Sequence, residues 1–494
     1  MPSLTQSLFP CRQVADHSAL TRREWLSRMG YGTGAAALAT LLGGSGSPAA
    51  PTPALIEGKT LPHFAPKAKR VICLFMSGGA SHLESFDYKP ALVERHGQPL
   101  PPSVFKGRLP LGMSQYQTQF PIQGPRWPFQ QHGQGGAWIS DRFPFLAKQA
   151  DKICFLNGMV SEAVNHDPAI IFMNSGHQLA GRPTMGAWLS YGLGSENENL
   201  PAYIVMVTKR NTDQPLSSRL WDSGFLPSQH QGVTFRPGAE PVLFLHNPAG
   251  LSDSLHRKMV EQLVEVQQEE LRLRGEAEIT ARIKQMEMAF RMQTAVPEVT
   301  DVSQESKATL ERYGKGVGKP GSFARNCLIA RKLCEKGVRY IQLFHPGWDQ
   351  HAGLDSRFEK GARDVDQPAA ALLQDLEDRD LLQETLVMFV TEFGRTPYSQ
   401  GPVSSATTGT YGREHHRDAF SFWVAGGGIK GGTTYGKTDE FGFDVVDGKV
   451  TANDFHATLL HLLGIDHERF TYRFQGRDYR LTNVAGTVVK PILA

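Results

Sequence analysis

Six short apolar runs, separated by longer segments that include stretches with helical periodicity, constrain the fold of this chain more than any other feature. The clearest is LVMFV at residues 386–390, which has no polar residue on either face. Such a strand is buried on both faces, as in parallel sheets that helices cover on both sides. Similar runs occupy residues 71–76, 153–156, 201–207, 338–344 and 420–425, and helical patterns occupy 183–192, 323–337 and 364–379. The pattern predicts an α/β fold with a mostly parallel central sheet.

Polar side chains flank two of these runs. Glu392 and Arg395 follow the run at 386–390, while His415 and His416 precede the run at 420–425. Open α/β sheets bind ligands beyond the carboxyl ends of their strands, so these four side chains are predicted to face one crevice. Carboxylate and imidazole groups together form a ligand set for a divalent metal such as zinc or manganese. The alternative is a salt bridge between Glu392 and Arg395, with both histidines on a solvated loop.

The run at 71–76 leads into SGGASHLESFD, which places Ser77, Ser81, His82 and Asp87 at the same sheet rim. A glycine pair after a strand lets the backbone approach a ligand closely. His82 and Asp87 are therefore predicted to bind the metal or the substrate. A tight turn that caps a helix start would explain the serines equally well but leaves His82 without a role.

A histidine also stands before a predicted helix in the second part of the sheet. Asp167-Pro168 is a typical helix start, with Asp167 as the cap and Pro168 in the first turn. His166 lies just before that start, near the positive end of the helix. The cap accounts for Asp167 but not for His166, so His166 is predicted to belong to the site.

The run at 338–344 is followed by HPGWDQH, in which one residue separates Asp349 from His351. In an extended segment both side chains leave the backbone on the same side. The pair can therefore coordinate one metal ion or bridge two. The alternative is a turn aspartate beside an exposed histidine.

Composition excludes several classes of function. The 494 residues carry a formal net charge of +3, too close to neutral to indicate binding to nucleic acid or to a membrane surface. No apolar run of about twenty residues follows the N-terminal region, so no integral membrane span is predicted after removal of a signal. None of the five cysteines forms a C-x-x-C pair, which argues against a zinc knuckle or a redox dithiol. Cys73 and Cys154 lie in apolar runs and are predicted to be packed thiols.

The N-terminal residues have the layout of an export signal. Arg22-Arg23 precedes a weakly apolar segment at residues 30–42, and a stretch rich in Ser, Pro and Ala follows at 43–53. This is typical of a twin-arginine signal at residues 1–50, and it predicts a periplasmic or secreted protein that the twin-arginine translocase exports. The alternative is an N-terminal tail with a chance arginine pair. The folded part is then one domain at 55–494, with a loop insertion at about 97–140 and a helical one at about 255–295.

Several segments resemble the secreted bacterial family known as domain of unknown function 1501. They are the twin-arginine start, SGGASHLESFD, GFLPSQHQGV, GWDQH, TEFGRTP, GREHH, AGGGIKGGTTYGKTDE and DFHATLLHLLGID. That family looks like a remote branch of the alkaline phosphatase and sulfatase superfamily. The resemblance implies an alkaline-phosphatase-like three-layer α/β sandwich in which Glu392, Asp349, His351 and either His415 or His416 resemble metal ligands.

The resemblance also has departures. Ser77 stands where the superfamily has its first-strand aspartate, and His166 stands where the nucleophile is expected. Either His166 attacks the substrate, or a metal-activated water does, or the chemistry is lost. Ser77 and Ser81 would then lie beside the substrate, and Arg395 or Arg413 would hold an anionic oxyester.

These observations lead to one leading hypothesis and one alternative. The first is an exported metal-dependent hydrolase of phosphate or sulfate esters, with zinc, manganese or calcium as cofactor and an anionic ester, such as a sulfated or phosphorylated glycan, as substrate. The second is a catalytically degenerate secreted protein that recognises a sulfated glycan or a protein partner. The predicted metal ligands are His82, Asp87, Asp349, His351, Glu392, His415 and His416, with His166 and Arg395 as catalytic residues.

Overall fold

The computed structural model describes residues 61–210, 216–238, 240–242, 247, 250–400 and 411–494. All of them belong to the second of two units into which the chain divides, Met1–Thr52 and Pro53–Ala494. The predicted export signal at 1–50 lies outside the described residues, as does Cys11. The other four cysteines, Cys73, Cys154, Cys327 and Cys334, are buried free thiols.

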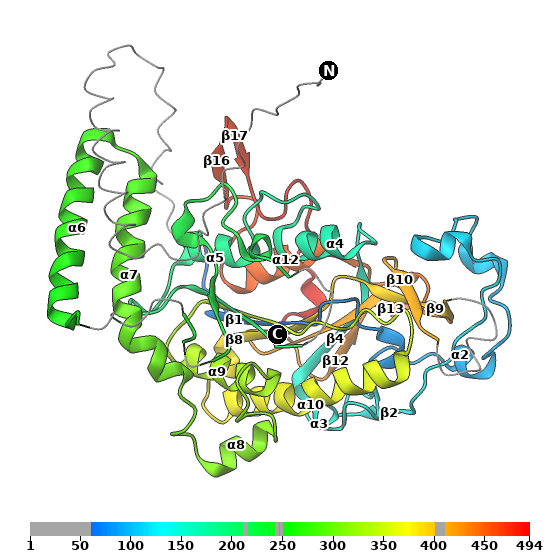
Figure 1. The fold of residues 1–494 in the computed structure, drawn as a ribbon. Helices are drawn as coiled ribbons and strands as arrows, with labels where there is room; N and C mark the ends of the chain where they lie inside the picture. Colours follow the sequence, from blue (N-terminus) through cyan, green and yellow to red (C-terminus); the bar gives the residue numbers. More distant parts are fainter. Residues whose placement is uncertain (1–60, 211–215, 239, 243–246, 248–249, 401–410) are drawn as a thin grey trace, which may run out of the picture. The chain divides into compact units, whose positions relative to one another are not determined.

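A nine-stranded sheet forms the centre of the fold (Figure 1). Its order is β12-β4-β11-β8-β1-β7-β5-β6, with β15 paired to β4. Only β11 runs against its neighbours in this sheet, because both of its pairings, with β4 and β8, are antiparallel. The bounds of the strands are β1 Arg70–Phe75, β4 Ile153–Val160, β5 Tyr203–Val207, β6 Val233–Phe235, β7 Tyr340–Phe344, β8 Thr385–Val390, β11 Phe420–Ala425, β12 Thr433–Tyr435 and β15 Val450–Thr451.

Helices cover both faces of the sheet. Figure 1 shows α4, α5 and α12 on one face and α3, α9 and α10 on the other. Their bounds are α3 Pro144–Ala147, α4 His166–Ser175, α5 Met185–Leu193, α9 Phe323–Glu335, α10 Leu354–Glu377 and α12 Ala452–Leu462. The predicted three-layer α/β sandwich with a mostly parallel central sheet is therefore confirmed.

The strand residues alternate between two apolar cores, which explains why the runs are apolar at nearly every position. In β1, Ile72 and Leu74 pack with the α9 and α10 side, whereas Val71, Cys73 and Phe75 pack with the α4, α5 and α12 side. Each strand residue thus faces a helix layer, as a fully covered parallel sheet requires.

Two helix starts differ from the sequence expectation, which is Asp167 as the cap of one helix and Asp454 as the cap of the helix that begins DFHATLLHLLG. Asp167 is not the cap of α4: Asn165 occupies that position, and Asp167 lies in the first turn and pairs with Arg219. Asp454 is the third residue of α12 and not its cap, since Thr451 caps the helix and exchanges hydrogen bonds with Asp454. Local propensity marks the first turn correctly but does not fix which residue closes it.

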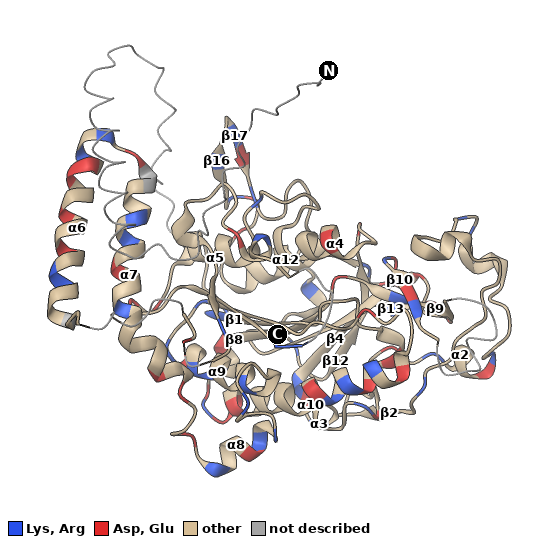
Figure 2. Ribbon diagram, in the orientation of Figure 1, with Lys and Arg blue, Asp and Glu red and all other residues tan. Residues whose placement is uncertain are grey.

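The helical insertion forms an antiparallel pair, α6 (Asp253–Arg274) and α7 (Ala277–Thr300), which is followed by the short α8 (Lys307–Tyr313). Gly275, with φ +68°, ends α6. Charged residues are spread along α6, α7, α8 and α10 but are sparse on the central strands (Figure 2). None of the described helices is both long enough and apolar enough to cross a membrane.

Helix α2 (Pro90–Glu94) precedes the loop insertion, which holds a small hairpin of β2 (Phe129–His132) and β3 (Ala137–Ser140). Short two-stranded ribbons complete the fold. They are β9 (Gly394–Ser399) with β10 (Arg413–His416), β13 (Lys437–Thr438) with β14 (Val445–Asp447), and β16 (Tyr472–Phe474) with β17 (Arg477–Tyr479).

Candidate metal centre

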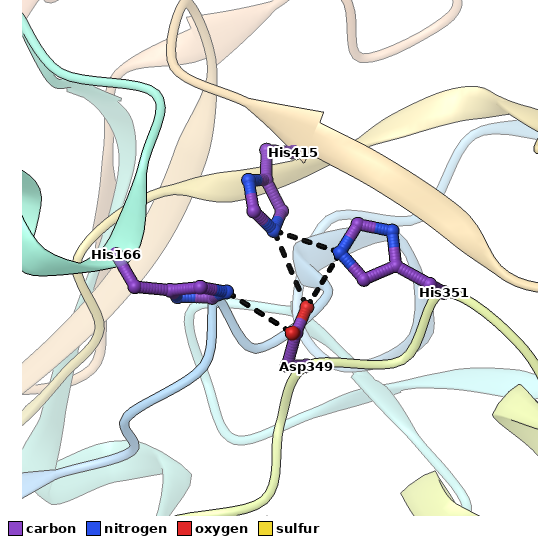
Figure 3. A group of neighbouring side chains, drawn as sticks. All are labelled: His166, Asp349, His351 and His415. Atoms are coloured by element: carbon purple, nitrogen blue, oxygen red, sulfur yellow. Dashed lines mark hydrogen bonds and ion pairs between the residues drawn. The ribbon is translucent and has the colours of Figure 1, made fainter. Parts of the chain in front are cut away.

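Four side chains from three distant segments meet at the carboxyl rim of the sheet. His166 begins α4, Asp349 and His351 follow β7, and His415 belongs to β10. Each offers one ligand atom, and these atoms all lie within 4.8 Å of one another. Figure 3 shows the three imidazole rings turned toward the carboxylate of Asp349. We call this set the His3Asp group.

The distances inside the His3Asp group are short. Asp349 Oδ1 lies 2.8 Å from His351 Nε2 and 3.3 Å from His415 Nε2, and Asp349 Oδ2 lies 3.2 Å from His166 Nε2. The Nε2 atoms of His351 and His415 are 2.9 Å apart. Four donors around a zinc ion at about 2.0–2.1 Å are about 3.4 Å from one another, so these separations are close to those of one tetrahedral site.

The outer ring nitrogen of each histidine meets an oxygen acceptor. His166 Nδ1 lies 2.8 Å from Glu392 Oε1, His351 Nδ1 lies 2.6 Å from Gln400 Oε1, and His415 Nδ1 lies 2.8 Å from the Val164 carbonyl. Each Nδ1 must therefore carry a hydrogen, and in the neutral rings the Nε2 lone pairs then point at one another. Metal-binding histidines are typically held in this way.

A cation would resolve the resulting conflict of lone pairs. Two neutral imidazoles that both donate through Nδ1 cannot hydrogen-bond to each other through Nε2 at 2.9 Å. His166 Nε2 is also buried without a hydrogen-bond partner among the described residues. The residues present thus fit a divalent ion with nitrogen and oxygen ligands.

The electrostatics of the group follow from these contacts. Burial opposes the charge of Asp349, but the three imidazoles and the Arg395 guanidinium around it hold the pKa of Asp349 well below its usual range. Burial also opposes a charged His166, but the nearby carboxylates of Asp349 and Glu392 raise the pKa of His166 to about 9. Burial lowers the pKa of His415 to about 3.

Glu392 lies in the shell around the His3Asp group and not in the group itself. Its side chain is fully buried, and its Oε1 accepts hydrogen bonds from His166 Nδ1 and from the Gly78 amide, each at 2.8 Å. Glu392 therefore orients His166, whereas the sequence predicted it as a direct ligand. The carboxylate still acts where the sequence placed it, at the end of β8.

The two arginines predicted to meet substrate are buried and already bonded. Arg395 donates to the carbonyls of Gly78, Gly79 and Arg413 and, at 2.8 Å, to Asp349 Oδ1. Arg413 donates to Glu84 and to the carbonyls of three further residues, Gln123, Gly124 and Thr396. Their side chains are 1% and 0% exposed, so neither presents a face to an anion. Arg395 instead positions the carboxylate of Asp349.

The structure does not bring three of the predicted ligands to the group. His82 is buried and bonds through Nε2 to the Gly442 carbonyl, and His416 bonds to the Phe443 carbonyl. Asp87 is buried with Lys89, 2.9 Å away, and accepts from Thr438. For His82 and Asp87 the reason is local: a 3₁₀ turn (His82–Glu84) follows the glycine pair, and their partners are Gly442 and Thr438.

Ser77 and Ser81 lie at the end of β1 as predicted, but both are fully buried. Their hydroxyls have no hydrogen-bond partner in the part of the chain that the structure describes. The Ser77 backbone contributes instead, since its amide donates to His345 and its carbonyl accepts from Trp348. This ladder aligns the loop that carries Asp349.

Sequence reasoning did not find three residues that support the group. Glu414 accepts from the His415 amide and lies 3.7 Å from His351 Nδ1, while Glu84 binds Arg413 two residues before His415. Gln400 accepts from His351. The carboxylates at 84 and 414 sit inside the motifs SHLESFD and GREHH, which was a usable signal, whereas nothing in the sequence points to Gln400.

Replacing Gly78 with alanine is expected to weaken metal binding. Gly78 has φ +123°, and a Cβ there would lie 2.5 Å from the Asp349 amide nitrogen, so the Asp349 backbone must move. Strain of this kind costs about 1–3 kcal/mol. Gly97→Ala is the matched control, because Gly97 also has a positive φ (+79°) but no atom within 4 Å of its Cβ. Titration with zinc while monitoring thermal unfolding compares the two variants, and equal zinc affinity would contradict the prediction.

Comparisons with known proteins agree with the family resemblance in the motifs. A family model described as "Protein of unknown function (DUF1501)" matches residues 68–493. No curated protein matches the chain. Similar solved structures include the lipoteichoic acid synthase LtaP from Listeria monocytogenes (10% identity, TM-score 0.34, 87% of this chain and 77% of that one). They also include the PsFucS1 sulfatase from Pseudoalteromonas sp. (14% identity, TM-score 0.31, 85% of this chain and 72% of that one). A third is the alkaline phosphatase from the Antarctic bacterium TAB5 (10% identity, TM-score 0.30, 81% of this chain and 98% of that one). Since the family model spans most of the sequence, this protein belongs to the DUF1501 family.

Proposed function

We propose that this protein is an exported metal-dependent hydrolase of phosphate or sulfate esters. The observation that carries the proposal is the His3Asp group, in which three Nδ1 atoms are fixed by oxygen acceptors and three Nε2 atoms face one carboxylate. Its position at the carboxyl rim of a parallel sheet, where α/β folds bind ligands, and the motif resemblance to phosphatases and sulfatases support it.

The chain's own residues have separate tasks in such a reaction. His166, Asp349, His351 and His415 would hold the ion, which when bound acts as a Lewis acid and lowers the pKa of water. Glu392 keeps the Nδ1 proton on His166, and Arg395 orients Asp349. The three imidazoles and the carboxylate all point toward the same ion position and are assigned as ligands. None of them, His166 included, is therefore assigned the role of nucleophile.

The experiment is metal analysis followed by an assay. Protein purified without chelator should contain about one zinc or manganese ion per chain, and it should hydrolyse nitrophenyl phosphate or nitrophenyl sulfate. Removal of the metal should abolish turnover, and adding it back should restore it. Bound metal without turnover on either ester would favour the alternative, a secreted binding protein for a sulfated glycan or a protein partner. Protein that neither contains nor binds metal would exclude both the hydrolase and the metal centre.

Metal binding is expected to strengthen as the pH rises toward about 9. The raised pKa of His166, about 9, means that Nε2 carries a proton below that pH, and a metal ion must displace it. With one proton displaced, the association constant should rise about tenfold per pH unit and level off once His166 is neutral. Calorimetry in buffers of different ionisation enthalpy counts the released protons. Glu392→Gln should lower that count, and an association constant independent of pH would contradict the prediction.

Arg219 is the proposed contact for the anionic group of the substrate. It lies in a 3₁₀ turn (Ser218–Trp221) and bonds to Asp167, the residue after His166, while its side chain stays 44% exposed. Arg219→Ala should lower kcat/KM about tenfold through KM, because a charge-assisted contact to the ester is lost. Metal content should not change. Arg272→Ala, an exposed arginine on α6, is the control, and an unchanged KM in Arg219→Ala would remove this residue from the site.

A further inference from the structure

A cavity of about 510 Å³ lies at the other end of the sheet from the His3Asp group. Pro201 and Ala202 line it just before the amino end of β5, and Val233 lines it at the start of β6. The ligands of the His3Asp group instead follow the carboxyl end of β7, which is parallel to β5. The cavity is therefore separate from the metal centre, and its volume suits a small organic molecule.

Helix α7 supplies an apolar wall of this cavity. Met288, Ala289 and Met292 line it from the helix, and Val233 and Val242 line it on the β6 side. Met292 is buried, whereas Ala289 is exposed. Methionine side chains adapt to ligands of irregular shape, so this wall favours the apolar body of a ligand.

A chain of three polar side chains lines the same cavity. Ser190 Oγ lies 3.0 Å from His230 Nδ1, and Gln229 Nε2 lies 3.1 Å from His230 Nε2. If the Gln229 amide donates to Nε2, then Nδ1 donates to Ser190, and the Ser190 hydroxyl hydrogen is left for a ligand. Gln229 Oε1 is buried without a partner among the described residues. Because this oxygen only accepts hydrogen bonds, a water molecule or a donor group on the ligand would satisfy it.

The cavity carries a single positive charge. Among the described residues that line it, only Lys284 is charged at neutral pH, since burial lowers the pKa of His230 to about 4 and leaves that ring neutral. No carboxylate within the described ranges forms a salt bridge with Lys284. We infer that this cavity binds an apolar organic anion, with its charged end toward Lys284 and the Ser190 hydroxyl and its apolar body against α7.

The test uses two fluorescent probes of similar size, anilinonaphthalene sulfonate, which is an anion, and phenylnaphthylamine, which is neutral. Both should bind the wild-type chain. Lys284→Gln should weaken binding of the sulfonate about tenfold and leave the neutral probe within about twofold, because only the sulfonate pairs with the ammonium. Ala289→Trp should abolish binding of both probes, since the exposed position lets the indole enter the cavity without disturbing the core.

Two variants of α6 are the controls. Lys258→Gln removes a lysine outside the cavity, and Val266→Gln alters the exposed apolar side of α6, where Val266 is 63% exposed. Both should leave binding of the two probes unchanged, as should removal of metal with a chelator. Circular dichroism confirms that each variant is folded. Loss of binding in Val266→Gln, full binding in Ala289→Trp, or equal weakening of both probes in Lys284→Gln would overturn the proposal.

Discussion

Asp349→Ala is expected to abolish metal binding at the His3Asp group and, with it, ester hydrolysis. All three imidazoles contact the carboxylate of Asp349, at 2.8 to 3.3 Å. Loss of a residue that only orients a ligand costs about 10–100-fold in metal affinity, and loss of a ligand itself should cost more than about 100-fold. Metal content after dialysis, together with calorimetric titration, measures the change.

Asp355→Ala is the matched control for this variant. Asp355 is also an aspartate near the rim, but it pairs with Arg126 at the surface and contacts no member of the His3Asp group. It should retain metal and activity at wild-type levels. Wild-type metal content in Asp349→Ala would show that the ion, if one binds, is held elsewhere.

Glu84→Ala is expected to lower the free energy of unfolding by about 3–5 kcal/mol, because it leaves the Arg413 guanidinium buried without its counter-charge. The two side chains are 0% exposed, and Glu84 Oε1 lies 2.7 Å from Arg413 Nη2. The same carboxylate accepts a hydrogen bond from the Arg126 amide. Urea unfolding, followed by circular dichroism, measures the loss.

Two further variants test the cause of this loss. Glu311→Ala removes an exposed helical ion pair with Lys307, 3.7 Å apart, and should change the unfolding free energy by less than about 1 kcal/mol. The double variant Glu84→Leu with Arg413→Met should recover part of the stability, since neither charge is then buried alone. A Glu84→Ala chain as stable as the Glu311→Ala chain would contradict the expectation.

The part of the site that could be predicted rests on the geometry of parallel sheets. The carboxyl ends of β1, β7 and β8 share one rim, so motifs far apart in the sequence had to approach one another. The single residue between Asp349 and His351 put both side chains on one side, which the structure confirms. His166 was separated from Asp167 by assigning Asp167 to the helix cap; the structure brings His166 to the group although Asn165 is the cap.

The remainder depends on side-chain direction, which sequence patterns do not carry. His415 and His416 are neighbours in β10, and the register of β10 on β9, with an irregularity after Arg413, decides which of them faces Asp349. The partners of His82 and Arg413 lie 360 and 329 residues away in the chain, at Gly442 and Glu84. Such pairings arise only from the packed structure, so an arginine that braces the backbone looks the same in a sequence as one that binds substrate.

The strand order also governs when the protein can fold during synthesis. β8 and β11 stand in the middle of the sheet, yet they come from residues 385–425, whereas their neighbours β1 and β4 are made hundreds of residues earlier. The amino-terminal strands leave the ribosome first, and their edges lack hydrogen-bonded neighbours until β8 and β11 have been synthesised. Nascent chains shorter than about four-fifths of the 494 residues therefore expose strand edges that can pair with other chains. Fragments that end before Thr385 should aggregate for this reason.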